Sequence, residues 1–248
     1  MMDNFVTLTH QNIGSEHICC AFSDRKCAAG YEAKKQWIKD QLDNGFVFHK
    51  LDVRGKVFIE YTPAEFSWHP VISDNCMMIN CFWVSGQYKE KGFGKQLLQK
   101  CIADSAEKNG IIAIVSNKKM PFLSDKKFFL ANGFKTIDTS PPYFELMYLP
   151  LSNAPAPAFN ESVRKAECEI KEGLAVYYSD ACPFTDYYVQ DFLKIAGNKG
   201  LKAQAVKIDT LEKAKKHFVP ATIYSVFRDG KFITHQILNE SMFRKFIG

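Results

Sequence analysis

The sequence predicts an α/β protein of the α+β type that is divided into two domains. Three observations support this prediction. Apolar strand-like runs and amphipathic helical segments alternate over residues 1–150, a stretch rich in proline and alanine interrupts them over 151–169, and the alternation restarts over 170–248. A chain of 248 residues is long enough for two domains of ordinary size.

The first domain is predicted to begin with a helix between short strands. Residues 4–9 and 15–22 have the weak pattern of a first strand region and its surroundings. Residues 31–42 have apolar side chains at helical spacing, and Asn44-Gly45 ends this predicted helix. Later elements follow in the order strand 46–51, strand 56–61, strand 77–84, a helix ending near Lys108, strand 111–116, helix 125–132 and strand 143–149.

Residues 81–98, CFWVSGQYKEKGFGKQLL, join the end of a strand to the start of a helix through a basic segment that contains glycine. Glycine lets a ligand approach the backbone, and the free N–H groups of a helix start attract anions. Lysines on both sides suit a ligand with several phosphates. The spacing of the glycines fits neither a P-loop nor the dinucleotide-binding fingerprint.

This loop resembles the acetyl-CoA signature of the GNAT-type N-acetyltransferases: Arg or Gln, two residues, Gly, one residue, Gly or Ala. Lys89 takes the first position, a departure from the pattern, and Gly92 and Gly94 take the others. The element order of residues 4–150 also resembles the GNAT fold, a mixed, mostly antiparallel sheet with flanking helices. The resemblance implies a cofactor site made by Phe82, Trp83, Val84, Lys89, Glu90, Lys91, Gly92, Phe93, Gly94, Lys95 and Asn117.

The resemblance further implies an enzyme that transfers acetyl from acetyl-CoA, its cosubstrate, to an amine of a small molecule or a peptide, without a metal ion. Two catalytic positions depart from the family. The tyrosine that protonates the CoA thiolate in many members is matched by Phe129, and the glutamate base of some members is matched by Met78.

Other residues are therefore considered for proton transfer. Glu60 is the first candidate for the base, because it ends a strand that should flank the acceptor side of the cleft. Tyr143 is a candidate for the missing acid. The alternatives are Glu65 and His69 for the base and Tyr148 for the acid.

The second domain, 170–248, has the predicted order β-α-β-α-β-β-α: strand 173–178, a helix to about Ala196, strand 203–209, helix 211–217, strands 222–227 and 232–238, and helix 241–247. With Cys182-Pro183 before its first helix and Val219-Pro220 before its third strand, it resembles a thioredoxin-like domain, in which the proline matching Pro220 is cis and faces the cysteine. The whole chain resembles bacterial acetyltransferases with a YoaP-like C-terminal domain.

Cys182 is the candidate for thiol chemistry, because a helix N-terminus lowers the pKa of a nearby thiol. Thr185 occupies the position of a second cysteine, so a two-cysteine cycle within the domain is not available. Cys182 could instead shape an acceptor pocket between the domains, where the segment FSWHP, residues 66–70, could also lie.

Composition narrows the class of protein. The net charge of +5 is mild and spread along the chain, so a nucleic-acid partner is not expected. No apolar run is long enough for a membrane helix, and the N-terminus lacks a signal-peptide pattern. Eight cysteines without a signal peptide favour reduced thiols in the cytoplasm. Besides acetyl transfer, two alternatives stay open: a thiol-redox sensor acting through Cys182 with CoA as effector, and a CoA-binding module without catalysis.

Overall fold

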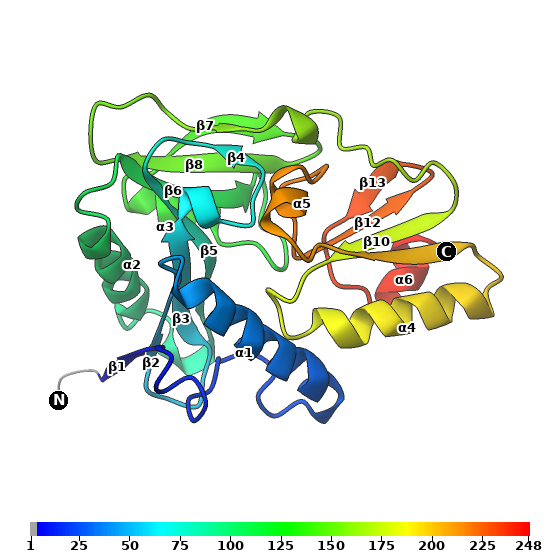
Figure 1. Ribbon diagram of the computed structural model, residues 1–248, viewed down its shortest axis with the longest axis horizontal. Helices are drawn as coiled ribbons and strands as arrows, with labels where there is room; N and C mark the ends of the chain where they lie inside the picture. The colour runs from blue at the N-terminus through cyan, green and yellow to red at the C-terminus, as the bar shows by residue number, and fades with distance from the viewer. Residues whose placement is uncertain (1–3) are drawn as a thin grey trace.

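The computed structural model describes residues 4–248 and contains two principal sheets that lie side by side (Figure 1). The first sheet has seven strands in the order β1-β2-β3-β5-β6-β8-β7. Its strands are β1 Phe5–Thr7, β2 Val47–Leu51, β3 Val57–Pro63, β5 Cys76–Val84, β6 Gly110–Ser116, β7 Lys135–Ser140 and β8 Phe144–Pro150. Three helices belong to this half: α1 Ala28–Leu42, α2 Phe93–Asp104 and α3 Lys126–Ala131.

The alternation of side chains along β3 shows how the two faces of the first sheet are covered. Val57 and Ile59 point to the face covered by α2, where Leu97 and Leu98 are fully buried. Phe58 points to the opposite face and packs in the cluster that includes α1. The C-terminal half of the chain covers the rest of this second face (Figure 1).

The C-terminal half contains a four-stranded sheet in the order β11-β10-β12-β13, with β10 parallel to β11 and antiparallel to β12. Its elements are β10 Leu174–Tyr178, α4 Thr185–Asn198, β11 Ala203–Lys207, α5 Leu211–Lys215, β12 Tyr224–Arg228, β13 Lys231–Thr234 and α6 Glu240–Phe246. The predicted order β-α-β-α-β-β-α is therefore confirmed.

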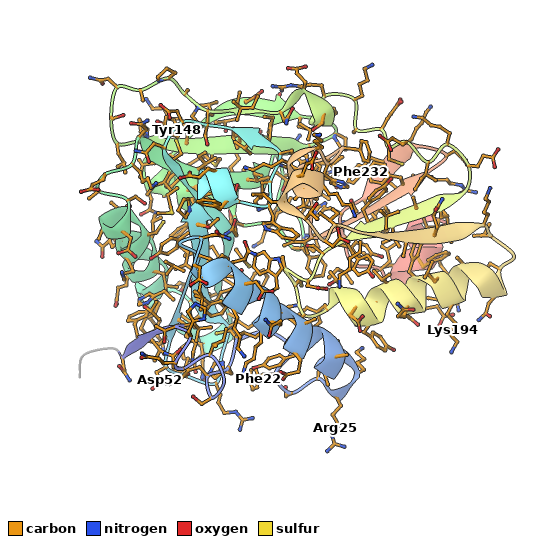
Figure 2. The ribbon with its side chains drawn as sticks, in the orientation of Figure 1. Phe22, Arg25, Asp52, Tyr148, Lys194 and Phe232 are labelled. Atoms are coloured by element: carbon orange, nitrogen blue, oxygen red, sulfur yellow. The ribbon has the colours of Figure 1, made fainter. Side chains whose placement is uncertain are left out.

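One cluster of the hydrophobic core spans both halves. A single cluster of buried side chains includes Met78 and Ile112 from the first sheet and Tyr177 and Phe227 from the second. Phe232 of β13, labelled in Figure 2, has its ring 5.9 Å from that of Phe144. The C-terminal half is thus packed against the first sheet along its apolar face.

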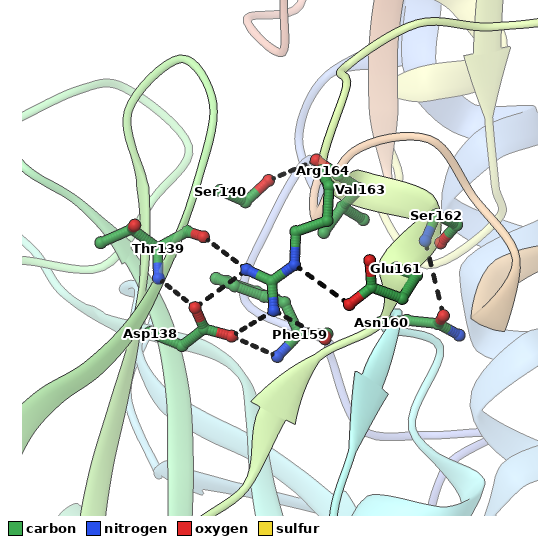
Figure 3. A network of polar contacts seen from close by, with 9 residues as sticks. All are labelled: Asp138, Thr139, Ser140, Phe159, Asn160, Glu161, Ser162, Val163 and Arg164. Carbon is green, nitrogen blue, oxygen red and sulfur yellow. Dashed lines mark hydrogen bonds and ion pairs between the residues drawn. The ribbon is translucent and has the colours of Figure 1, made fainter.

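The proline-rich segment is attached to the first sheet at its β7 edge. Its strand β9, Ala158–Phe159, pairs with β4, Val71–Ile72. Arg164 donates two hydrogen bonds, of 2.9 and 2.8 Å, to the two carboxylate oxygens of Asp138 (Figure 3). The same carboxylate accepts from the N–H of Phe159 at 2.8 Å. The Arg164 guanidinium lowers the pKa of Asp138, so this contact between the proline-rich segment and β7 is an ion pair at neutral pH.

Several local predictions were wrong. Residues 15–22 form a loop and no strand, since Cys19 and Ala21 have positive φ angles of 63° and 57°. Helix α2 ends at Asp104, well before Lys108, where the Ser105 hydroxyl donates to the Cys101 carbonyl.

Two further differences concern the later strands. Strand β7 was missed because it is a largely polar edge strand without an apolar alternation. The cis bond expected before Pro220 is not there. The cis peptide bond within residues 4–248 is Pro141–Pro142.

Candidate active site

The strands β5 and β6 separate part of the way along the first sheet. They pair in parallel from Cys76 to Ile79, opposite Gly110 to Ala113. Beyond Ile79, strand β5 continues to Val84 beside β3, while β6 continues beside β8. The sheet therefore forks at Ile79, and one edge of β5 is left for another extended chain to pair with.

Asn80 lies at this fork as the extra residue of a β-bulge. On β3, Glu60 is opposite Cys81 and Tyr61 is opposite Ile79, so Asn80 has no partner in the register. Its Nδ2 atom is buried and makes no hydrogen bond within the described residues. A buried amide donor without an acceptor is costly, so a ligand that accepts a hydrogen bond here would be stabilised.

A cavity of about 260 Å³ lies next to the fork, between the two halves of the molecule. Its walls are mostly apolar and include Phe58, Trp83, Phe122 and Phe184. The polar and charged side chains of the lining are Lys34, Lys56, Glu60, His69, Asn80, Ser124, Thr222, Tyr224 and His235, together with the thiols of Cys20, Cys81 and Cys182. We call this cavity the interdomain pocket.

Glu60 is a wall residue of the interdomain pocket and is almost completely buried, with 4% of its surface exposed. The Nζ of Lys34 donates to its Oε2 at 2.8 Å and also to the carbonyl of Ala181 in the other half at 2.6 Å. Burial raises the pKa of Glu60, and Lys34 opposes that increase. Oε1 makes no hydrogen bond within the described residues, which leaves it for a ligand.

Two histidines of the pocket are held neutral by burial, which lowers the pKa of each to about 4. His69 Nδ1 lies 3.3 Å from the carbonyl of Pro220, and His235 Nε2 lies 2.8 Å from that of Pro121. Because carbonyls only accept, these nitrogens carry the protons. His235 Nδ1 must then accept from the Tyr143 hydroxyl, 2.6 Å away.

Tyr143 is hydrogen-bonded to the pocket residue His235 but is not itself part of the pocket wall. Burial raises the pKa of its hydroxyl to about 12, so it keeps its proton at neutral pH. That proton is donated to His235.

Cys182 lines the pocket together with His69, so the two segments that were expected to meet there do so. The predicted decrease in its pKa is wrong. Helix α4 begins only at Thr185, and burial raises the pKa of the thiol despite the N–H of Phe184 and the charge of Lys34.

The glycine-containing loop precedes α2 on the surface of the first half. Lys89, Lys91 and Lys95 are exposed, as is Glu90. Gly92 has a φ of 82° as the residue before α2, and no side chain caps the helix start. A left-handed conformation and an uncapped helix start are the features by which a backbone binds phosphate.

The other residues expected at the cofactor site surround this loop and the fork. The ring of Phe82 stacks on Phe128 at 4.8 Å, and Gly94 is close to both, since a Cβ there would lie 3.2 Å from Phe128. Val84 and Phe93 pack in the core beneath α2. Asn117 is exposed in the turn after β6, where its N–H donates to the carbonyl of Tyr143, and it is not part of the pocket wall.

Several polar pocket residues were not predicted from the sequence, among them Lys34, Lys56, Asn80 and His235. Asn80 left a signal, since it is the one polar residue in the apolar run MMINCFWV. Lys34 lies in a helix, Lys56 directly before a strand and His235 in a loop. No local sequence pattern indicates that these three segments meet.

Comparisons with known proteins agree with this architecture. Residues 13–134 match the acetyltransferase (GNAT) family, and residues 203–245 match the YoaP-like family. The chain is 42% identical over 246 residues to the uncharacterized N-acetyltransferase YoaP of Bacillus subtilis strain 168, and the alignment covers 98% of each protein.

Similar solved structures cover about 60% of the chain. A GNAT-family acetyltransferase of Staphylococcus aureus Mu50 is 18% identical, with a TM-score of 0.42, and the match covers 60% of this chain and 99% of that one. The PaiA N-acetyltransferase of Thermoplasma acidophilum, in complex with coenzyme A, is 17% identical with a TM-score of 0.41 and the same coverage.

Within residues 4–248, the helices are all too short or too polar to cross a bilayer. The near full-length relationship to an N-acetyltransferase agrees with the forked sheet and the loop before α2. The chain belongs to the GNAT family of N-acetyltransferases, with a YoaP-like segment in its C-terminal half.

Proposed function

We propose that the protein transfers the acetyl group of acetyl-CoA to an amine bound in the interdomain pocket. The observation that carries this proposal is the course of β5. The strand forks from β6 beside the pocket, and past Val84 the chain enters the loop before α2. A molecule held by that loop and extended along β5 would therefore bring its far end to the pocket.

The loop residues Lys89 to Lys95 would hold the pyrophosphate, mainly through backbone N–H groups at the start of α2. The pantetheine arm would pair with the free edge of β5, at Phe82, Trp83 and Val84. Asn117 is proposed to lie near the same arm.

At the fork, the thioester would meet Asn80 and Glu60. The unpartnered Nδ2 of Asn80 is suited to donate to the thioester carbonyl oxygen, whose negative charge grows in the transition state. The neutral amine attacks the carbonyl carbon, the C–N bond forms, the C–S bond breaks and the CoA thiolate leaves. The surplus proton of the amine passes to Glu60, which Lys34 orients through Oε2.

Cys182 is proposed as a wall of the acceptor site, since burial raises the pKa of its thiol. The mechanism does not use Tyr143, because its proton is donated to His235. The strand order of the C-terminal half supports the proposal that it is a thioredoxin-like domain which now serves as half of a binding site.

The cofactor part of this proposal is tested by calorimetric titration of acetyl-CoA and CoA into the native protein and into Gly92→Glu. We expect binding by the native protein and none by the variant, because the glutamate would put negative charge and a strained left-handed side chain at the phosphates. Gly14→Glu, at a glycine with open space around it, is the matched control. Absence of binding by the native protein would overturn the proposal.

The role of Glu60 is tested by steady-state kinetics of Glu60→Gln with an amine that the native enzyme acetylates. We expect kcat to fall by about 10²-fold or more, because a positioned base contributes about 10²–10⁴-fold. Circular dichroism and acetyl-CoA binding would show that the variant is folded.

His69→Gln is the control for this test, because it changes another titratable group of the pocket wall. A fast Glu60→Gln enzyme and a slow His69→Gln enzyme would move the role of base to His69.

A further inference from the structure

The charges of the interdomain pocket do not balance. Among the residues that the structure describes, three charged side chains line it, and two of them, Lys34 and Glu60, neutralise each other at 2.8 Å. Lys56 is the third, and it forms no ion pair within residues 4–248. Its Nζ lies 5.6 Å from the centre of the Phe184 ring, and this ring is part of the pocket wall. The pocket therefore has one surplus positive charge.

Lys56 and Glu60 face the same space. Residues 56, 58 and 60 of the chain alternate onto one side of the strand, and all three line the pocket. Four residues of extended chain span about 13 Å, a distance that a flexible lysine side chain can shorten. Cys182, a lining residue from the C-terminal half, is close enough to both for Glu60 to raise its pKa and for Lys56 to lower it. A small molecule in the pocket can thus contact both the Lys56 ammonium and the Glu60 carboxylate.

The remaining walls favour an apolar body for that molecule. Aromatic rings from both halves border the space, among them Trp83, Phe122 and Phe184. Trp83 and Phe122 have 42% and 50% of their surface exposed, values that are high for large apolar side chains. Apolar and aromatic walls with a few placed polar groups are typical of sites for small ligands.

We propose that the acceptor is an amine that also carries a carboxylate, such as an amino acid with an apolar or aromatic side chain. Its carboxylate pairs with Lys56, its amine faces Glu60, and its side chain packs on the aromatic walls. This inference rests on the proposed function. A polyamine is disfavoured, because its second cation would meet Lys56, and the described lining of the pocket offers no carboxylate besides Glu60.

The test compares matched acceptors at saturating acetyl-CoA, with the acetylated product measured by mass spectrometry. The carboxylate-bearing probes are phenylalanine, leucine and methionine. Phenethylamine and isoamylamine lack only the carboxylate of the first two, and spermidine is the polyamine. We expect kcat/KM for phenylalanine to exceed that for phenethylamine by about tenfold or more, the contribution of a charged hydrogen bond.

Lys56→Gln should remove this preference. We expect KM for phenylalanine to rise by about tenfold, for the same reason, while phenethylamine and acetyl-CoA keep their KM values. Lys194→Gln, which changes an exposed lysine of α4 (Figure 2), is the matched control and should change none of them.

Three results would overturn the inference. Equal or better turnover of phenethylamine or spermidine would exclude a carboxylate requirement. A change in KM for acetyl-CoA alone would assign Lys56 to the cofactor. Failure of all carboxylate-bearing amines to bind or react, with acetyl-CoA still bound, would also reject it. Absence of acetyl-CoA binding would instead reject the proposed function.

Discussion

The cofactor loop and the interdomain pocket differ in how the chain builds them. The loop is seven consecutive residues, 89–95, mostly exposed, whose useful property is the backbone geometry at the start of α2. The pocket has buried polar groups, among them Glu60 and His69, and is made by segments from both halves, as far apart in sequence as Ile18 and Ile237. A phosphate site can therefore be local, whereas the acceptor site depends on the whole tertiary structure.

Because buried histidines line the pocket, we expect acid to destabilise the folded protein, in part through the pocket. Burial lowers the pKa of His69 and His235 to about 4 each, and that of His217 in the C-terminal half to about 3. In the unfolded chain each titrates near 6.5. Between these values the unfolded state binds protons that the folded state excludes, so stability is full above pH 6.5 and is lost as the pH falls.

Each histidine should contribute up to about 1.4 kcal/mol of lost stability per pH unit in this range. Urea denaturation between pH 7.5 and pH 5 measures the effect. The slope of stability against pH should become shallower by about 1 kcal/mol per unit in His235→Gln.

His10→Gln, which removes an exposed imidazole rather than a buried one, is the matched comparison. A native protein that is equally stable at pH 7.5 and at pH 5 would show that burial does not hold these histidines neutral. The pocket and the loop would then not differ in this electrostatic respect.

The same contrast explains how far the sequence could be interpreted. The loop, the strand before it and the helix after it were predictable, because glycine, lysine and apolar spacing are local signals. Glu60 was predicted as a pocket residue from the strand that carries it. Its partner Lys34 was not, because a lysine within an amphipathic helix looks like a solvated residue until the rest of the fold covers it.

The C-terminal half shows a second limit. The order of its elements was predicted from periodicity, but the pKa of Cys182 was predicted in the wrong direction. The helix field that lowers a thiol pKa depends on local position, whereas the burial that raises it depends on the tertiary structure around the residue. The polar edge strand β7 was missed because nothing apolar marks it.

The smallest expected effect concerns the close packing of α1 on the loop that carries Cys182. A Cβ at Gly30 would lie 2.4 Å from the carbonyl oxygen of Pro183, so Gly30→Ala must shift the pocket wall. In a helix, Gly→Ala usually stabilises by about 0.5–1 kcal/mol, and Gly197→Ala in α4, where the space is open, should do so. Gly30→Ala should instead destabilise by about 1–3 kcal/mol, the usual cost of overpacking.

Urea denaturation and calorimetry would separate the two regions in this variant. We expect Gly30→Ala to raise KM for the acceptor while it binds acetyl-CoA as the native protein does, since the loop before α2 is built by its own residues. If Gly30→Ala gained stability as Gly197→Ala does, the segment around Pro183 must be able to move and make room for the added methyl group. If acetyl-CoA binding also weakened, the cofactor loop would depend on the domain contact, and the division between a local and a tertiary site would fail.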